Sequence, residues 1–506
     1  MAQTNGGLSR EQQNELYRTA VNKTAKADKQ SGRLNDVIVS KPKKRRVYEP
    51  PVSAAVPEKT DVKRTARQSD NTEKISAEKP AAKQKHRKAT IGDIAAEKKD
   101  KAIRSLLSRP KCTDAPAVEC TWFKKRGRFD MPLFTVVLIL LVMGIVMMSS
   151  ASYAYSLAEQ SDSFVYMEQQ LQGAIIGFVA LCFASKLDYH AYIKPWKRKS
   201  KKKYAAENGN GLNAAKVAFV FSCVLMIAVY FFGEAVNDAK RWITIFGVQF
   251  QPSELLKIAA ILLVAYMLQR YYEQRRDIWY GFLKYWLVLI PACVFCLMQR
   301  HVSAMLIIFA IIYVMMFVGG SHRGGMISLI VLAVVALAML LFVFKWDYLT
   351  ERLQSFFEPF SATQDSTYQT SQSLITIGSG GWFGLGLGNS RQKYFYLPES
   401  QNDFVFSIIC EELGFVGAMT VILLFVLFEC RGFLIAAKAK DKFGSFVALG
   451  ITLQIGIQAL LNIGVACNAI PNTGISLPFF SYGRTALIIQ MFEVGILLSV
   501  SKQSDT

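Results

Sequence analysis

Apolar and polar positions alternate in long blocks along the chain beyond about residue 130. Apolar stretches of about 17 to 25 residues, a length that crosses a hydrocarbon core about 30 Å thick as a helix, are separated there by polar connections. Since backbone groups in lipid need internal hydrogen bonds, repeated stretches of this kind predict a helical bundle. We therefore expect an all-α integral membrane protein with about ten transmembrane helices, at roughly 132–153, 168–186, 214–233, 253–269, 280–298, 302–319, 326–345, 403–428, 445–468 and 483–500.

The first 130 residues have a different composition. They are rich in Lys, Ala, Glu, Ser and Thr and poor in aromatic residues, so they bury too little surface to offset the entropy of ordering. Residues 1–130 are predicted to be a disordered cytoplasmic tail, and residues 131–502 a polytopic transmembrane domain. The tail contains no apolar segment of the kind that signal peptides carry, so we expect no cleavable signal peptide.

Basic residues mark one side of the predicted membrane domain. Lys and Arg gather at the end of the tail and in alternate connections, whereas the connection at about 154–167 has none. By the positive-inside rule, both termini are expected on the cytoplasmic side of the bacterial plasma membrane. The basic positions that support this orientation are Lys124, Lys125, Arg126, Arg128, Lys194, Lys197, Arg198, Lys199, Lys201, Lys202, Lys203, Arg275, Arg276, Arg323, Arg431, Lys438, Lys440 and Lys442.

The formal net charge is +21, and most of it lies in the tail, where residues 1–130 hold 31 Lys and Arg against 16 Asp and Glu. The string from Lys41 to Arg46 resembles a nuclear-localisation signal and raises the alternative of nucleic-acid binding. A basic tail joined to a membrane bundle more often contacts anionic lipid head groups. We expect anionic lipids as the partner of the tail, and no nucleic acid.

The nine cysteines show no framework. Seven lie in or beside apolar stretches, where cysteine behaves as a small hydrophobe, and Cys112 and Cys120 have no histidine spacing for zinc. We expect neither a structural disulfide nor a structural metal.

This topology places four segments on the outer side, at about 234–252, at Arg300 and His301, at 346–402 and at 469–482. The third is a large extracytoplasmic loop between spans seven and eight. Loops of that length without evident secondary structure tend to be functional or disordered, and this one is too aromatic for disorder. We expect it to pack as a cap on the outer face.

The fourth span opens with Glu254 and Lys257 three residues apart on one helical face. Charges at that depth are costly and usually paired. The pair is interpreted either as a structural ion pair at a helix start or as the polar floor of an outward-facing site.

The large loop contains a GxGxG run at Gly384, Gly386 and Gly388. A dinucleotide site is excluded because no strand precedes the run and the loop faces outward. These glycines are expected to allow tight turns and a close backbone approach to a ligand or a neighbouring helix.

Acidic and basic side chains gather where this loop enters span eight. Arg391 and Lys393 follow the glycines, and Asp403 stands at the junction, where it is either a helix N-cap or a catalyst. Two further acids, Glu411 and Glu412, lie deeper and are expected to be functional or paired with a base such as Lys257.

The last outer segment, residues 471–484, mixes Pro, Gly and hydroxyl residues, among them Ser481. A broken polar stretch at membrane depth survives where it is buried in protein or lines a cavity. We interpret this segment as the second wall of the site.

Four motifs together resemble the SEDS family (shape, elongation, division and sporulation), the family of FtsW, RodA and SpoVE. They are QPSELLK at 251–257, GLGLGNSRQKYFYLPESQNDFVF at 384–406, EELG at 411–414 and PNTGISLPFFSYG at 471–483. The resemblance covers about residues 130–502, and the NSRQK and QNDF strings are most similar to the division and sporulation members.

The resemblance implies a peptidoglycan glycosyltransferase that polymerises lipid II into glycan strands at the outer face of the membrane, for septal or spore wall synthesis. Asp403 matches the family's loop aspartate, proposed as its catalytic residue. An ionised Asp could accept the proton of an attacking sugar hydroxyl in an inverting transfer. A class B penicillin-binding protein, the transpeptidase, and other divisome proteins are the partners that the resemblance implies.

The leaving group is a lipid diphosphate, whose developing charge calls for Arg, Lys or a divalent cation. We expect Mg or Mn and no organic cofactor. Arg241, Glu254 and Lys257 match family positions thought important, while roles for Arg391 and Lys393 are inferred from their charge. The candidate substrate-binding residues are Arg241, Glu254, Lys257, Arg391, Lys393 and Ser481.

Two positions depart from the family pattern. Arg484 replaces the second glycine of a usual SYGG and either assists the diphosphate or is peculiar to this lineage. The turn Gln299–Ala304 lacks the Pro and Asp of a QPDLGT-like motif, so no catalytic role is carried to it. The alternatives to the enzyme are a lipid II flippase, which needs a polar path through the bilayer, and a non-catalytic divisome scaffold, in which Asp403 is only a cap.

Overall fold

The structure is a computed structural model that describes residues 127, 129–194, 212–236, 239–245, 248–339, 347–361 and 365–504. The predicted disordered tail therefore lies outside the described residues, except at its C-terminal end. The basic stretch from Lys197 to Lys203, on which part of the predicted orientation depends, also lies outside them.

Helices dominate the described residues. They are α3 (Met131–Gln160), α4 (Val165–Lys186), η1 (Tyr189–Tyr192), α6 (Ala214–Phe232), α7 (Pro252–Arg270), α8 (Ile278–Gly281), η2 (Leu283–Tyr285), α9 (Trp286–Met298), α10 (Val302–Gly319), α11 (Arg323–Ala338), α12 (Asp347–Phe357), α13 (Asp365–Ser379), α14 (Val405–Lys438), α15 (Lys442–Ala466) and α16 (Arg484–Gln503).

Each of the ten predicted spans overlaps with helix in the described residues, and residues 340–345 of the seventh lie outside them. Eight helical segments in the described ranges are long and apolar enough to cross a membrane: α3, α6, α7, the segment Ile278–Met298, α10, α14, α15 and α16. The other two predicted spans are α4, whose first turns contain Glu168, Gln169 and Gln170, and α11, whose apolar part is short. The chain is thus a multi-pass helical membrane protein.

Three predicted boundaries differ from the structure. Helices α3 and α14 continue to Gln160 and Lys438, well beyond the predicted apolar stretches. A helix can continue past the hydrocarbon core because its backbone hydrogen bonds are internal in lipid and in water alike. The predicted span at 280–298 is interrupted near Phe282, whose φ of −141° and ψ of −64° separate α8 from η2 and α9.

The outer segment between α6 and α7 contains a small sheet that the hydropathy pattern did not reveal. Strands β1 (Glu234–Val236), β2 (Ala239–Ile245) and β3 (Val248–Phe250) pair antiparallel in the order β1-β2-β3. The pairing brings Glu234 opposite Trp242 and Ile243 opposite Phe250. Strands of three residues are too short to show a clear period of two in the sequence.

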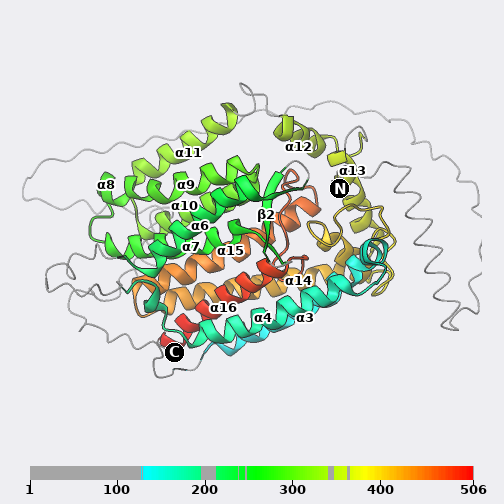
Figure 1. Cartoon of the computed structure of the whole chain (residues 1–506), viewed down its shortest axis with the longest axis horizontal. Helices are drawn as coiled ribbons and strands as arrows, with labels where there is room; N and C mark the ends of the chain where they lie inside the picture. The colour runs from blue at the N-terminus through cyan, green and yellow to red at the C-terminus, as the bar shows by residue number, and fades with distance from the viewer. Residues whose placement is uncertain are drawn as a thin grey trace, which may run out of the picture. The chain divides into compact units, whose positions relative to one another are not determined.

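The large outer loop also contains regular structure that its sequence did not suggest, namely α12 and α13. Helix α13 packs on α14 and α15, and Ser373 Oγ lies 2.7 Å from both Ser407 Oγ and the Ala466 carbonyl oxygen. The sheet, α12 and α13 occupy one end of the bundle in Figure 1, while α8 and the C-terminus occupy the other.

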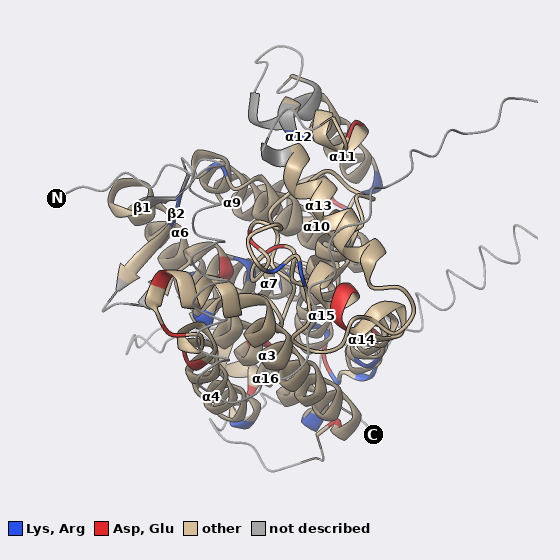
Figure 2. Ribbon diagram, turned by 90° about the vertical axis from the view of Figure 1, so that its right-hand side faces the viewer, with Lys and Arg blue, Asp and Glu red and all other residues tan. Residues whose placement is uncertain are grey.

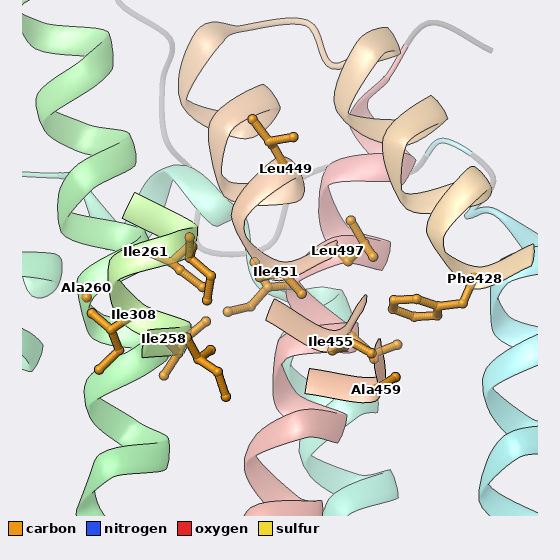
Figure 3. Packing of buried hydrophobic residues seen from close by; sticks show 14 of the residues in the cluster. Ile258, Ala260, Ile261, Ile308, Phe428, Leu449, Ile451, Ile455, Ala459 and Leu497 are labelled. Atoms are coloured by element: carbon orange, nitrogen blue, oxygen red, sulfur yellow. The ribbon is translucent and has the colours of Figure 1, made fainter. Parts of the chain in front are cut away.

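Helix α15 lies at the centre of the bundle and packs against α14, α7, α10 and α16. Figure 3 shows Ile451 and Ile455 of α15 among apolar side chains of α7, α10, α14 and α16. In the most apolar window of α7, 83% of residues are buried, against 28% in α6, so α7 is an inner helix and α6 a peripheral one. Most of the helical ribbon in Figure 2 carries no charged residue, as a lipid-facing exterior requires.

Candidate functional site

Asp403 lies in the loop just before α14, and its backbone is fixed from two sides. The Asn462 side chain of α15 donates from Nδ2 to the Asp403 carbonyl oxygen at 2.7 Å. The Ser481 hydroxyl donates to the neighbouring Asn402 carbonyl oxygen at 2.5 Å. Helix α15 and the segment around Ser481, which are far from Asp403 in the sequence, therefore fix the position of its backbone.

The Asp403 carboxylate is not a helix cap. The N-cap of α14 is Phe404, and no side chain caps this helix. Within the described residues, no donor is hydrogen-bonded to the Asp403 carboxylate. One oxygen faces Gly474, where a Cβ atom would come within 3.3 Å of Oδ2. The interpretation of Asp403 as an N-cap is therefore wrong, and its carboxylate is left accessible to a ligand.

Charges around Asp403 oppose one another. Burial and the nearby Glu399 carboxylate raise its pKa to about 6, while the Arg352 and Arg241 guanidinium groups act in the lowering direction. The Asp403 carboxylate is therefore mostly ionised at pH 7. A carboxylate with a pKa near neutrality is better matched to proton transfer than an ordinary aspartate.

Arg352 and Arg241 come from α12 and β2, two elements that were expected to be loop. Arg352 Nη1 donates to the Asn472 carbonyl oxygen and lies 3.4 Å from Asn472 Oδ1. Arg241 Nη2 donates to the Arg300 carbonyl oxygen at 2.8 Å, and its buried Nε has no partner among the described atoms. Arg352 was missed because an arginine in a long loop carries no distinguishing sequence signal.

A column of buried amides on α15 leads from Asp403 into the bundle. Gln454, Gln458 and Asn462 are spaced four residues apart and so share one helical face. Asn462 also donates to the Ile475 carbonyl oxygen at 2.6 Å, and Gln458 Nε2 donates to that of Ser476 at 3.1 Å. The column thus ties the last outer segment to Asp403, as the prediction of a second wall requires.

The predicted charge pair on α7 is present and buried. Lys257 Nζ lies 2.7 Å from Glu254 Oε1 and donates to Gln458 Oε1 at 3.1 Å. Because Gln458 in turn holds Ser476, the pair is both a structural ion pair and a polar floor beneath the last outer segment. Glu254 Oε2 has no partner among the described atoms.

His301 is a buried imidazole at the start of α10 that the sequence did not single out. Burial, together with the positive charges of Arg241 and Lys257, holds its pKa well below the ordinary value. The ring is therefore neutral at pH 7, and its Nδ1 has no partner in the described part of the chain. A neutral imidazole leaves the positive charge around His301 to Arg241 and Lys257.

Lys393 makes contacts unlike those expected of a substrate-binding lysine. Its ammonium donates to the Gly388 carbonyl oxygen at 2.6 Å and to Ser150 Oγ at 3.0 Å, and pairs with Glu412 Oε1 at 3.1 Å. All three donors are thus used inside the protein, and the side chain is 2% exposed. We assign Lys393 to holding the loop, and Glu412 is paired with Lys393 rather than with Lys257.

Glu411 fixes the same loop through its carboxylate. The hydroxyl of Ser390 and the backbone N–H groups of Arg391 and Gln392 all donate to it, the last two at 3.2 and 3.4 Å. Glu411 and Glu412 therefore both hold the loop at residues 388–393 in place.

The glycine run packs against a break in α14, as expected of residues that allow close backbone approach. Gly414 has φ 68° and ψ −166°, which frees carbonyl groups in the preceding turn. The N–H groups of Leu385 and Gly386 donate to the Glu411 and Glu412 carbonyl oxygens, both at 2.9 Å. A Cβ atom on Gly384 would lie 2.2 Å from the Glu412 carbonyl oxygen, so no larger residue fits.

The remaining candidates lie apart from the Asp403 carboxylate. Ser481 is 7% exposed, and its hydroxyl also accepts from the Leu477 N–H at 2.7 Å, so it positions the loop around Asn402. Arg391 is exposed and lines a depression that does not include Asp403. Arg484 begins α16 beside Gly173 of α4.

The donor set does not suit a resident metal ion. Over the residues that the structure describes, no group of three or more His, Cys, Asp or Glu side chains could hold one. Mg²⁺ is often bound by one or two carboxylates together with substrate phosphates. The expectation of Mg or Mn stays a prediction.

Comparison with protein families gives a match over residues 131–506 to the family described as cell cycle protein, that of FtsW, RodA and SpoVE. A probable peptidoglycan glycosyltransferase FtsW from Geobacter sp. (strain M18) is 35% identical over 373 residues, covering 74% of this chain and 96% of the relative. Stage V sporulation protein E from Bacillus subtilis (strain 168) is 35% identical over 380 residues, covering 75% of this chain and 99% of the relative.

Solved structures share the fold. A structure described as "Structural coordination of polymerization and crosslinking by a peptidoglycan synthase complex" matches with a TM-score of 0.58 and 24% identity, covering 74% of this chain and 98% of that one. The crystal structure of Thermus thermophilus rod shape determining protein RodA matches with a TM-score of 0.53 and 23% identity, covering 75% and 98%.

Proposed function

The chain belongs to the family of cell cycle proteins that includes FtsW, RodA and SpoVE, and we propose on this premise that it is a peptidoglycan glycosyltransferase. The observation that carries the proposal is the Asp403 carboxylate. Hydrogen bonds to the Asp403 and Asn402 carbonyl oxygens hold its backbone, and the carboxylate accepts no hydrogen bond from the described residues. Burial and Glu399 raise its pKa, while Arg352 and Arg241 oppose that rise.

The substrate in this proposal is lipid II, a disaccharide-peptide on an undecaprenyl diphosphate. Asp403 accepts the proton of the attacking sugar hydroxyl as its oxygen bonds to the anomeric carbon of the donor. The bond from that carbon to the diphosphate oxygen breaks on the opposite face, which inverts the anomeric configuration. One base and a good leaving group suffice for this step.

The negative charge that develops on the diphosphate needs nearby cations. Arg241 and Arg352 are assigned to this task because both lower the pKa of Asp403 and lie at the same end of the bundle as its carboxylate. The Glu254–Lys257 pair supports the floor below them through Gln458. A divalent cation carried by the diphosphate would add charge neutralisation there.

The buried polar column favours an enzyme over a flippase. It runs from Asn462 to Gln454, which donates to both carboxylate oxygens of Glu493 at 2.8 Å. On the next turns of the same face, Gly450 packs on Ile261 and Val447 is buried in the apolar core. A flippase needs polar groups along the whole path, and this column ends about midway along α15.

We propose partners and orientation that agree with this activity. A class B penicillin-binding protein would supply crosslinking, other divisome proteins would recruit the chain, and the basic tail would contact anionic lipids. The end of the bundle that carries Asp403 faces outward, and both termini are cytoplasmic.

The activity is tested by lipid II polymerisation with purified protein, its transpeptidase partner and divalent metal. We expect glycan strands from the parent and none from Asp403→Asn, which keeps the size of the side chain but cannot accept the proton. Asp277→Asn, at the other end of the bundle, is the matched control and should keep full activity. Equal activity of Asp403→Asn and parent would remove Asp403 from the mechanism, and an inactive parent would favour a flippase or a scaffold.

The orientation is tested by thiol labelling of intact cells. Cys467 is exposed at the C-terminal end of α15, the end at which Asn462 contacts Asp403. A variant that keeps Cys467 as its sole cysteine should react with a membrane-impermeant maleimide from outside. A variant whose sole cysteine is introduced by Ser504→Cys should react only after the cells are opened. The reverse pattern would invert the topology.

A further inference from the structure

The outer loop that precedes Asp403 carries a depression of its own. It has a volume of about 500 Å³ and is lined by Gly388, Asn389, Ser390, Arg391, Gln392, Tyr394 and Tyr396. Small-molecule sites in proteins typically measure about 300 to 1,000 Å³. The depression is therefore large enough for a sugar with a short peptide.

The frame of this depression is fixed from below. Glu411 holds the backbone N–H groups of Arg391 and Gln392, and Lys393 holds the Gly388 carbonyl oxygen. The Phe395 ring packs on Tyr155 of α3 with centroids 4.8 Å apart. A loop held in this way loses little conformational freedom when a ligand binds, which favours affinity.

The lining combines one cation with groups that suit hydroxyls and amides. Arg391 holds the loop through its backbone, since its N–H donates to Glu411 and its carbonyl oxygen accepts from the Tyr394 N–H. Its side chain is exposed, and its guanidinium has no ion-pair partner within 4 Å among the described residues. Gln392 Oε1 is a buried acceptor without a partner among the described atoms. The Tyr396 side chain is 44% exposed and offers an aromatic face.

Each of these groups selects part of a ligand. A guanidinium pairs with a carboxylate through two parallel hydrogen bonds. A buried acceptor is satisfied by an N–H or O–H donor, and tyrosine supplies a flat apolar face with a polar edge. A ligand that carries a carboxylate, N–H or O–H donors and a ring meets all three requirements.

We propose that this depression binds the carboxylate-bearing saccharide–peptide part of a peptidoglycan chain, at a place separate from the residues that receive the diphosphate. The proposal rests on the glycosyltransferase function and names a second contact for the same substrate class. The alternative anion is the diphosphate itself, but the depression offers one arginine, while Arg241 and Arg352 both act on Asp403. Contact with the peptide would keep a strand in place between successive additions.

The test measures binding in the full-length chain with Asp403→Asn, which separates binding from turnover. The probes are the soluble disaccharide-pentapeptide without lipid or phosphate, the disaccharide without peptide, and inorganic pyrophosphate, each titrated by calorimetry. Arg391→Ala should weaken binding of the disaccharide-pentapeptide tenfold or more, and Arg391→Lys should weaken it less. Arg391→Ala should leave pyrophosphate binding unchanged, and the disaccharide alone should bind more weakly than the disaccharide-pentapeptide.

The control is Arg276→Ala, which removes an exposed arginine at the other end of the bundle and should change no affinity. The proposal is overturned if the disaccharide-pentapeptide does not bind, if Arg391→Ala leaves its affinity unchanged, or if that variant loses pyrophosphate instead. Failure of the glycosyltransferase function is distinguishable, because it would appear as no polymerisation by the parent while the fragment still bound in an Arg391-dependent manner.

Discussion

At the scale of single residues, Asp403 is prepared for proton transfer by its surroundings. Its carbonyl and that of Asn402 accept the hydrogen bonds that fix the loop, so the carboxylate is left for a ligand. Glu399 and burial raise its pKa while two arginines oppose that rise. The balance among these groups, more than the identity of the aspartate, determines the pH at which it acts as a base.

The pH dependence of polymerisation should reveal this balance. The acid limb of kcat/KM should have its midpoint near pH 6, the pKa of Asp403, with activity lost as pH falls because the protonated base cannot accept a proton. Glu399→Gln removes a like charge, lowers the pKa of Asp403 and should move the limb to lower pH. Glu358→Gln, an exposed acid on the same loop, is the control and should leave the limb in place. A limb unmoved by Glu399→Gln would contradict the assignment of Asp403 as the base.

Gly474 should be intolerant of a side chain for two reasons. Its φ is +65°, where an L-residue is strained by about 1 kcal/mol, and its missing Cβ would lie 3.3 Å from Asp403 Oδ2. Gly474→Ala should lower kcat/KM on the order of tenfold or more, since small displacements of a reacting group are costly. Gly378→Ala in α13, where a Cβ atom would meet nothing within 4 Å, should leave polymerisation unchanged. Parent-like kinetics of Gly474→Ala would show that the carboxylate is not confined there.

At the scale of elements, α14 and the outer loop form one unit. The break at Gly414 frees carbonyl groups that accept from the Leu385 and Gly386 N–H groups. Glu411 and Glu412, in the turn before the break, hold the loop that precedes α14. Lys393 completes this unit by neutralising Glu412. A buried pair of this kind is most visible when one partner is removed, because the other is then left charged and buried.

Lys393→Met should therefore lower stability before it affects chemistry. The free energy of unfolding should fall by about 3 to 5 kcal/mol, because Glu412 is left buried without its partner. The change should appear as a lower thermal unfolding midpoint in detergent. Adding Glu412→Gln should recover part of the loss. Arg391→Met, two residues away and exposed, should keep the parent midpoint. An unchanged midpoint in Lys393→Met together with lost substrate binding would restore Lys393 to the substrate site.

At the scale of the whole molecule, the end opposite Asp403 is held together by a charged cluster. His190 Nδ1 lies 2.8 Å from Asp188 Oδ1, and its Nε2 lies 3.5 Å from Asp441 Oδ1. Gln503 at the end of α16 donates to Asp188 at 3.1 Å, and the Tyr189 hydroxyl donates to Asp441. Two connections between membrane helices and the end of α16 thus meet in one polar cluster, which fixes these helix ends far from the loop that carries Asp403.

This cluster predicts a pH window for stability. Burial alone would lower the pKa of His190, but hydrogen bonds and charge attraction from Asp188 and Asp441 outweigh it and raise the pKa to about 9. The folded state therefore gains stability from protonated His190 that is complete below about pH 6.5 and lost as pH rises through about 9. Thermal unfolding of His190→Gln should show a lower midpoint at neutral pH that converges with the parent above pH 9. Midpoints that differ by the same amount from pH 6 to 10 would contradict a charged His190.

The sequence by itself determined the membrane architecture, because a long apolar stretch is a local property and is by itself enough to stabilise a helix in the hydrocarbon core. It also predicted the Glu254–Lys257 pair, since charges within an apolar segment stand out, whereas the catalytic role of Asp403 stays a prediction. The family match over residues 131–506 and the helices at the ten predicted spans confirm that level of description. The expected close backbone approach of the glycine run to a neighbouring helix is confirmed, since Gly384 packs against the Glu412 carbonyl oxygen of α14.

Only the tertiary structure decided which charged groups act together. Arg352 and Arg241 act on the pKa of Asp403 from α12 and from a small sheet, whose short, mixed sequences carry no clear period. Lys393 is as basic in sequence as Arg391, yet one is buried against Glu412 and the other is exposed. The difference comes from how α3 and α14 pack around the loop, because they bring Ser150 and Glu412 to the Lys393 ammonium, and a local sequence pattern does not show which residues the packing brings together.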